Sequence, residues 1–408
     1  MKKASFIIAF LFIFYYSAIA QHLKKDTTNY TPKSLTLDEI NLVSGYYAQN
    51  GDHSSVEGGI GSELVHELST TIDLKFVGYS NPDYIHTLTF GMGYAHHTSA
   101  SQAWISTSGA SKTRGDRFFP SFEWSMQDVK HKTEFSLGSN YSGEYNYQSL
   151  TFDGSFSKKT NTNGEFSVKL TTSLDQVLLI LPSEFRTTST SVVISSASTG
   201  SITSYETERE HFGSSPRNTY TAAFAFNQVI NARMQGALLF DVTQQTGFLG
   251  LPFHRVYFTN GTDKIENLPK NRTRIPVAAR LNYFLGDNLI IRTYYRYYAD
   301  SWGIKSNTAM IETPIKLSPF FSISPFYRYY QQTAARYFAP YMQHATTDTY
   351  FTSNYSYSAF SANFFGADVK WMPLTPIGGF IKSIELRYGH YKQTTGLVAN
   401  VVTLHLKF

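Results

Sequence analysis

The 408-residue chain contains no cysteine. A disulfide framework, a thiolate metal site and a cysteine nucleophile are therefore excluded. The 35 lysines and arginines only slightly outnumber the 30 aspartates and glutamates, and they are scattered along the chain. Because nucleic-acid binding needs positive charge gathered into a patch or stripe, we expect no nucleic-acid partner.

Long apolar runs are also missing from most of the chain. After residue 20, no stretch reaches the roughly 18 apolar residues that a membrane helix needs. The N-terminus differs, because Lys2 and Lys3 precede a short apolar run that ends before Ala18-Ile19-Ala20. This order predicts a Sec-type signal peptide at residues 1–20, followed by a periplasmic segment at 21–34. A retained N-terminal anchor helix is the alternative.

Aromatic residues are abundant, with 32 phenylalanines and 29 tyrosines. Both residue types favour strands and membrane interfaces. Residues 165–175 show the clearest strand pattern, with apolar side chains at 166, 168, 170 and 174 and mostly polar ones between them. Residues 397–408 repeat the pattern and end on Phe408. This C-terminal strand, which ends on an aromatic residue, resembles the closing strand of an outer-membrane barrel. A soluble β-sandwich is the alternative.

Short turns and long polar loops alternate between the expected strands, which is typical of barrels with short periplasmic turns and long outer loops. We therefore predict an all-β fold, a transmembrane antiparallel β-barrel of about 16 strands (about 14 to 16 fit the pattern). It would span residues 35–408 in the bacterial outer membrane, contact lipid, and be inserted by the β-barrel assembly machinery. The long outer loops are expected near residues 48–63, 96–116, 178–215, 244–271 and 333–356.

The expected inward faces of the strands carry many charges. The arginines come from the second half of the chain and the carboxylates mostly from the first half. Opposite charges on opposite walls predict the transverse field of a pore constriction, and a basic wall favours anions. A salt-bridged ladder that fills a narrow barrel is the alternative. The residues are Arg233, Arg280, Arg292, Arg296, Arg328 and Arg387, with Glu39, Asp73, Glu123, Glu134, Asp153 and Glu165.

The expected outer loops hold other reactive side chains. Asp52, His53, Glu57, His96 and His97 could together supply metal ligands, but no fixed short spacing supports this, and turn hydrogen bonds are the favoured interpretation. Serines near the histidines lack a G-x-S-x-G elbow. We therefore predict a protein that is not an enzyme and has no bound metal or cofactor.

Several segments form distinctive motifs: Gly45–Tyr47 with Gly51–Gly61, Thr98–Ser101, Leu268-Pro269 before Arg272 and Arg274, Tyr295–Ser306 and Tyr327–Ala335. Together these motifs are similar to the family catalogued as domain of unknown function 3570. The resemblance implies an outer-membrane barrel of Gram-negative bacteria without an established activity. Some members are encoded beside flavin-attaching and thioredoxin-like proteins, which implies a part in envelope redox or metal handling.

In the expected topology these motifs lie at the outer rim, with arginines just below them. We predict a rim or lumen site for a small polar solute, either anionic or metal-linked, in a pore, transporter or receptor. For the site, the alternative is a network of side chains at the rim that holds the loops. For the function, the alternative is a plugged structural or interaction barrel in an envelope redox or assembly system, with outer loops that bind a partner. The sequence does not set the oligomeric state. The predicted site residues are Asp52, His53, Arg292, Arg296, Asp300 and Arg328.

Overall fold

The computed structural model describes residues 32–98, 115–179 and 213–408. The predicted signal peptide, most of the predicted periplasmic segment, and much of the predicted loops at 96–116 and 178–215 lie outside the described residues. Within the described ranges, no helix is long and apolar enough to cross a membrane.

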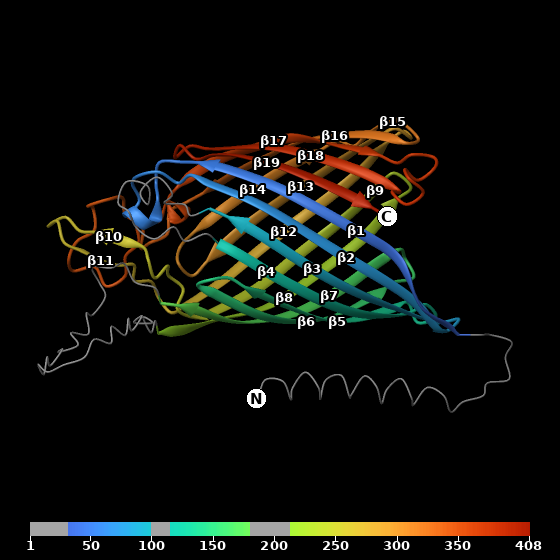
Figure 1. Ribbon diagram of the computed structural model, residues 1–408, viewed down its shortest axis with the longest axis horizontal. Helices are drawn as coiled ribbons and strands as arrows, with labels where there is room; N and C mark the ends of the chain where they lie inside the picture. The colour runs from blue at the N-terminus through green and yellow to red at the C-terminus, as the bar shows by residue number, and fades with distance from the viewer. Residues whose placement is uncertain (1–31, 99–114, 180–212) are drawn as a thin grey trace, which may run out of the picture.

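The strands form one antiparallel sheet that closes into a barrel (Figure 1). β1 pairs with β2 on one side and with the last strand, β19, on the other, so the sheet has no open edge. The sheet strands are β1 (Lys33–Asn50), β2 (Val65–Asn81), β3 (Tyr84–His97), β4 (Gly115–Asp128), β5 (Thr133–Gly143), β6 (Tyr147–Lys159), β7 (Gly164–Leu178), β8 (Ser214–Asn231), β9 (Met234–Gly247), β12 (Asn271–Leu285), β13 (Leu289–Asp300), β14 (Lys305–Glu312), β15 (Ile315–Ser318), β16 (Phe321–Gln332), β17 (Phe360–Trp371), β18 (Ser383–Gln393) and β19 (Val398–Lys407).

One strand position is interrupted. The sequence predicts a single strand over residues 307–316, whereas the structure has β14 and β15 in succession, both between β13 and β16. Pro314 lies at the break, and proline has no N–H to donate to the ladder. The 17 strands of the sheet therefore occupy 16 positions around the barrel. The predicted antiparallel barrel of about 16 strands is confirmed.

The outside of the barrel is apolar. Alternate residues along each strand point outward, and Leu68, Phe90 and Leu238 are 58%, 46% and 63% exposed. Their neighbours in sequence point inward and are more polar, as in β7, where Asp175 is buried. A sheet with an apolar exterior and no free edge makes all its backbone hydrogen bonds within the sheet, as hydrocarbon requires because no water is available there.

The two ends of the barrel differ. At one end, here called the turn end, hairpins such as those at residues 82–83 and 232–233 are tight. The opposite end, the loop end, carries connections 51–64, 248–270 and 333–359. Each end has an exception to its usual connection length. At the loop end, β13 and β14 are joined by residues 301–304 alone; at the turn end, β17 and β18 are joined by the longer connection 372–382.

The three long described loops fold together at the loop end, and we call residues 51–64, 248–270 and 333–359 the cap. The cap contains a short hairpin, β10 (Arg255–Tyr257) with β11 (Asp263–Ile265), inside the segment 244–271 that was predicted as loop. It also contains the 3-10 turns η2 (Ser55–Glu57) and η4 (Tyr355–Tyr357). Figure 1 shows β10 and β11 beyond the barrel wall, at the end away from the C-terminus. Two clusters of buried side chains hold the cap together: Val256, Phe258 and Phe351, and Leu249, Leu268 and Trp302.

Candidate functional site

Arginines line the interior of the second half of the barrel. We call Arg280, Arg292, Arg296, Arg328 and Arg387 the basic wall; they lie on β12, β13, β16 and β18. Their inward direction is shown by contacts between strands that are not neighbours. Arg387 on β18 reaches Glu312 on β14, with 3.5 Å between Nη2 and Oε2. Arg233, which was predicted to face the lumen, instead lies in the tight turn after β8, because the strand ends at Asn231.

Aromatic rings hold two of these guanidinium groups in place. The Arg328 guanidinium lies 4.7 Å from the ring centre of Phe364, and that of Arg387 lies 4.2 Å from the ring centre of Phe326. A cation over a ring face is attracted by the ring quadrupole and keeps its charge. Arg328 is also within electrostatic reach of Arg296 and Arg387. Three positive charges are therefore close together on one wall of the lumen.

The arginines of the basic wall differ in how they are partnered within the described residues, and Asp241 of β9 lies within electrostatic reach of Arg296. Arg292 pairs with Glu312 at 2.9 Å, and the same carboxylate receives Arg387. By contrast, the buried Nε of Arg296 has no hydrogen-bond partner in the part of the chain that the structure describes. A buried donor without a partner is unfavourable, so Arg296 is the group of this wall best placed to gain from an incoming anion.

The facing wall, built from the early strands, is rich in carboxylates, as predicted. Two of them are paired with lysines: Glu39 with Lys407 at 2.6 Å, and Asp153 with Lys169 at 2.9 Å. The separation of charge is therefore incomplete, since part of the acidic wall is neutralised by its own lysines.

Two cavities open into the lumen near the turn end. One has a volume of about 630 Å³ and the other of about 510 Å³. Both are lined by Arg280 and Asn282; the first also by Lys132 and Lys159, and the second by Arg292. Each volume is within the usual range of small-molecule sites. The interior therefore has space for a small solute beside its arginines.

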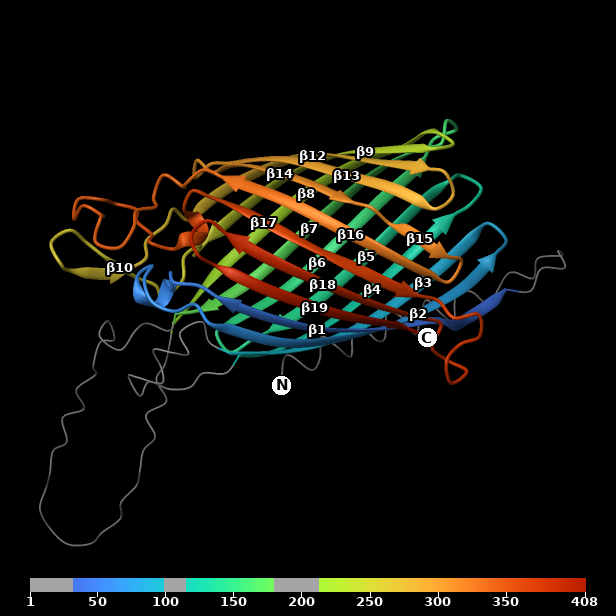
Figure 2. The same ribbon diagram turned by 90° about the horizontal axis from the view of Figure 1, so that it is seen from above.

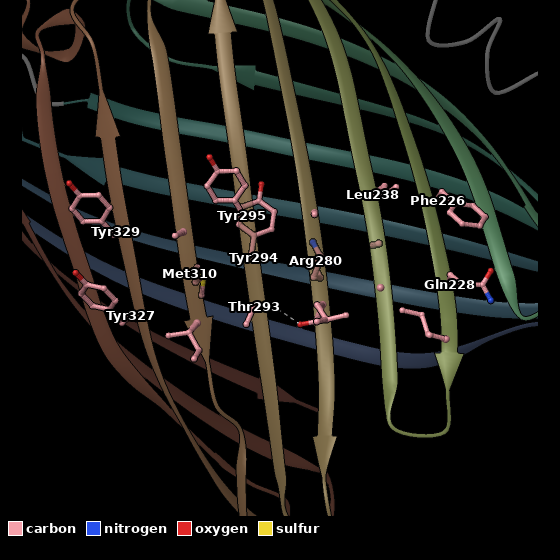
Figure 3. Close-up of a pocket in the computed structure, with 17 residues that line it drawn as sticks. Phe226, Gln228, Leu238, Arg280, Thr293, Tyr294, Tyr295, Met310, Tyr327 and Tyr329 are labelled. Atoms are coloured by element: carbon pink, nitrogen blue, oxygen red, sulfur yellow. Dashed lines mark hydrogen bonds between the residues drawn. The ribbon is translucent and has the colours of Figure 1, made fainter.

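A larger groove, of about 740 Å³, lies on the outside of the barrel over β8 to β16 (Figure 3). Its outward-facing side chains are apolar or aromatic, among them Leu238, Tyr295, Tyr327 and Tyr329. Because this wall faces hydrocarbon, the groove is a lipid-facing surface and not a site for a polar solute.

An ion pair beside two aromatic rings, which meet edge to face, joins the cap to the barrel rim. Arg272 pairs with the fully buried carboxylate of Asp300, with 2.5 Å between Nη2 and Oδ2. The same guanidinium lies 4.4 Å from the ring centre of Trp302 and 5.6 Å from that of Tyr357 in the cap. Gln332 of β16 adds hydrogen bonds to two cap carbonyls, at 3.0 and 2.6 Å. These contacts fix the cap over the mouth of the barrel.

The cap also contacts the rim elsewhere. Arg217 of β8 donates to the carbonyls of Phe248 and Gly250, at 2.8 and 2.7 Å. Arg255 donates to the carbonyl of Val56 at 2.9 Å, which joins two of the cap loops. β8 and β16 are separated by β9, β12, β13 and β14, so these contacts attach the cap to one contiguous side of the rim.

Glu266, His254 and His344 are titratable groups buried inside the cap. Glu266 accepts hydrogen bonds from the Leu251 N–H, at 2.6 Å, and from the Thr352 hydroxyl. Burial nevertheless raises the pKa of Glu266 to about 7, because it penalises the charged carboxylate more than these bonds favour it. His254 is fully buried, and neither ring nitrogen has a partner among the described residues. Burial, with His344 nearby, lowers the pKa of His254 to about 3.

The predicted site residues fall into three separate places. Arg296 and Arg328 lie together on the basic wall, and Arg292 lies on the same wall nearer the turn end, paired with Glu312. Asp300 is at the rim, where Arg272 occupies its carboxylate. The remaining two, Asp52 and His53, are in the cap.

His53 has a structural role in the cap. Its Nδ1 lies 2.8 Å from the Gly59 carbonyl, and its ring stacks on that of Tyr355 at 3.5 Å between centres. Asp52 is exposed and lies close to Glu63. Burial raises the pKa of Glu63 to about 7, and the negative charge of Asp52 adds to this rise. The ion pair of Arg272 with Asp300 was not predicted as part of the site. The only sequence signal for Arg272 was its place in a motif similar to the family.

The candidate metal ligands are also dispersed. His96 lies 2.7 Å from Asp116, and His97 lies 3.0 Å from Glu144. Across the described ranges, no group of three or more histidine, aspartate or glutamate side chains is arranged to hold a metal ion. The geometry therefore favours hydrogen-bonding roles for these residues.

A closed barrel with an apolar exterior, a charged interior and loops gathered at one end defines a transmembrane β-barrel of the bacterial outer membrane. Within that class, residues 91–401 match the family model described as Protein of unknown function (DUF3570). The chain belongs to this family, and the predicted resemblance is confirmed.

Comparison with curated proteins gave no match. Among solved structures, OccD3 (OpdP) of Pseudomonas aeruginosa is similar at 9% identity over 93% of this chain and 95% of its own, with a TM-score of 0.42. OpdQ of the same organism has 7% identity over 91% and 98%, with a TM-score of 0.41. A mutant of its ferric enterobactin receptor PfeA has 10% identity over 87% and 53%, with a TM-score of 0.45. Likeness at this level carries no functional argument.

Proposed function

We propose that the protein is a non-enzymatic outer-membrane pore that passes small anionic solutes and whose outer mouth is covered by the folded cap. The observation that carries this proposal is the basic wall. Arg296 and Arg328 stand together on it, and a cavity of about 510 Å³ lies beside Arg280 and Arg292 of the same wall. Fixed positive charge in a narrow, low-dielectric passage lowers the energy of an anion within it and raises that of a cation.

Ion selectivity in planar bilayers tests the proposal. With a gradient of potassium chloride across the bilayer, the reversal potential of the wild-type protein should show that chloride permeates better than potassium. Arg296→Ala and Arg328→Ala should each lower this preference, and the double variant should lower it further. Arg233→Ala is the matched control, because it removes the same charge from the turn outside the barrel wall. Equal selectivity in all four variants and the wild type would contradict an anion-selecting wall.

A plugged interaction barrel is the second candidate, and the cap is the observation that favours it. Trp302 is 1% exposed and Phe258 is fully buried, so the loops are packed like a small domain and not spread as an open rim. In that case the cap would present a surface to a partner, and the lumen would serve no passage. Absence of conductance, both in the wild type and in a variant with a loosened cap such as Trp302→Ala, would favour this candidate over the pore.

A further inference from the structure

The connection between β17 and β18 differs from the other connections at the turn end. It runs over residues 372–382, whereas the hairpins at 82–83, 232–233 and 319–320 are as tight as antiparallel pairing allows. Its sequence, Met-Pro-Leu-Thr-Pro-Ile-Gly-Gly-Phe-Ile-Lys, is mostly apolar. A long connection made mostly of apolar residues needs a physical reason, because the exposure of apolar side chains to water is unfavourable.

The apolar side chains of this connection are not packed inside the protein. Met372, Leu374 and Phe380 are 49%, 79% and 57% exposed. An exposed cluster of this kind on a stable protein marks a surface that something apolar covers.

The contacts of the connection show which way it leans. The Phe380 ring stacks on that of Phe408, with 5.9 Å between centres and 11° between planes, and the Lys382 ammonium donates to the Phe408 carbonyl at 3.0 Å. Phe408 follows Leu404 at the outward spacing of the closing strand. The connection therefore leans over the outer wall of the barrel, and Figure 2 shows it leaving the outline of the barrel beside the C-terminus.

The surface also continues the lipid-facing belt. Leu317, Phe321 and Trp371 lie at or next to the turn-end termini of β15, β16 and β17 and are 62%, 38% and 43% exposed. The Met372 N–H donates to the Phe320 carbonyl at 2.8 Å, which ties the connection to the β15–β16 hairpin beside it. Aromatic and aliphatic side chains at this level of a barrel occupy the boundary between lipid tails and headgroups.

We propose that residues 372–382 form a membrane anchor, which places Leu374 and Phe380 in the phospholipid leaflet at the turn end. The anchor would fix the depth of this side of the barrel in the bilayer, and it does not depend on whether the lumen conducts. Continuity with the lipid-facing belt favours lipid over a partner protein as the occupant.

Spin labels measure the location of this segment directly. Because the chain has no cysteine, Leu374→Cys gives a protein with a single attachment site for a nitroxide. The protein is placed in vesicles of phospholipid alone. The collision rate of the nitroxide with dissolved oxygen, which concentrates in lipid, is compared with its collision rate with a water-soluble nickel chelate. Leu238→Cys on the outer wall is the lipid reference, and Asp287→Cys in the tight β12–β13 turn is the water reference.

A label at residue 374 should behave like that at 238, with oxygen collisions exceeding chelate collisions. A label at 374 that behaves like that at 287 would overturn the anchor, and would leave a partner protein as the occupant. Phe380→Cys provides a second position, for which the same result is expected. Folding of each variant is checked by the resistance of the barrel to unfolding in detergent without heating.

Discussion

Replacement of Glu266 by glutamine should make the cap more stable at neutral and alkaline pH. Glu266 is 3% exposed and joins two of the cap loops through Leu251 and Thr352. Glutamine has the same shape; its oxygen can accept from the Leu251 N–H, and its amide can donate to the Thr352 hydroxyl. The variant therefore keeps the connections and removes only the ionisable proton.

The magnitude follows from the pKa. Glu266 has a pKa of about 7 in the folded cap and 4.5 as its ordinary value, so between these values the folded state binds more protons than the unfolded state. Stability is consequently full below pH 4.5 and falls as the pH rises towards 7. One pKa unit corresponds to about 1.4 kcal/mol, so the loss at and above neutral pH approaches about 3 kcal/mol. Glu266→Gln escapes this loss.

His254 gives the prediction a second signature. Its pKa is about 3 in the folded cap and 6.5 ordinarily, so its contribution to stability is full above pH 6.5 and is lost as the pH falls towards 3. In the wild type the effects of Glu266 and His254 oppose each other between pH 4.5 and 6.5, and the stability of the cap should be nearly constant there. In Glu266→Gln only the histidine remains, so stability should rise with pH over that window.

Hydrogen exchange of backbone amides, followed on peptides from residues 248–270 in lipid nanodiscs, measures this. At about pH 8, protection in Glu266→Gln should exceed that of the wild type by on the order of 100-fold, and the difference should shrink towards pH 4.5. Asp263→Asn, which removes a carboxylate from β11 away from the Glu266 hydrogen bonds, is the matched control and should show no such change. Equal protection of wild type and Glu266→Gln at alkaline pH would refute the reasoning.

Three further substitutions test other contacts. Trp302→Ala should destabilise the cap by about 3–5 kcal/mol, since a fully buried indole leaves a cavity and its N–H to Asn271 is lost; increased exchange over 248–270 is the readout, and unchanged exchange contradicts it. His53→Ala should cost about 1 kcal/mol through loss of the stack on Tyr355, measured by exchange over 51–64, with His66→Ala on β2 as the control. Glu39→Gln should weaken the seam between β1 and β19 by less than about 1 kcal/mol, because the pair with Lys407 is partly exposed; detergent unfolding at low and high salt checks it, and a difference that does not shrink with salt argues against the ion pair.

The membrane barrel itself could be predicted from the sequence alone. Alternation of apolar and polar residues has the same period as the strand, so the greasy face of residues 165–175 and of 397–408 could be located without coordinates. Closure followed from chemistry, because a sheet in hydrocarbon must leave no edge unpaired. The inward direction of Arg296 and Arg328 followed from the same alternation, whereas Arg233 was misplaced because alternation does not locate the end of a strand.

Only the tertiary structure decided how the loops are used. Loop residues have no repeat that reports their partners, and the contacts that form the cap join positions far apart in the chain, such as Arg255 with Val56 and Thr352 with Glu266. The predicted grouping of His53 with Arg296 and Asp300 failed for this reason: His53 packs on Tyr355, and Arg272 takes the Asp300 carboxylate. The sequence by itself thus determined the wall and the charge of its lining, because both repeat every second residue. The cap and its buried Glu266 depend on long-range packing, which no local pattern encodes.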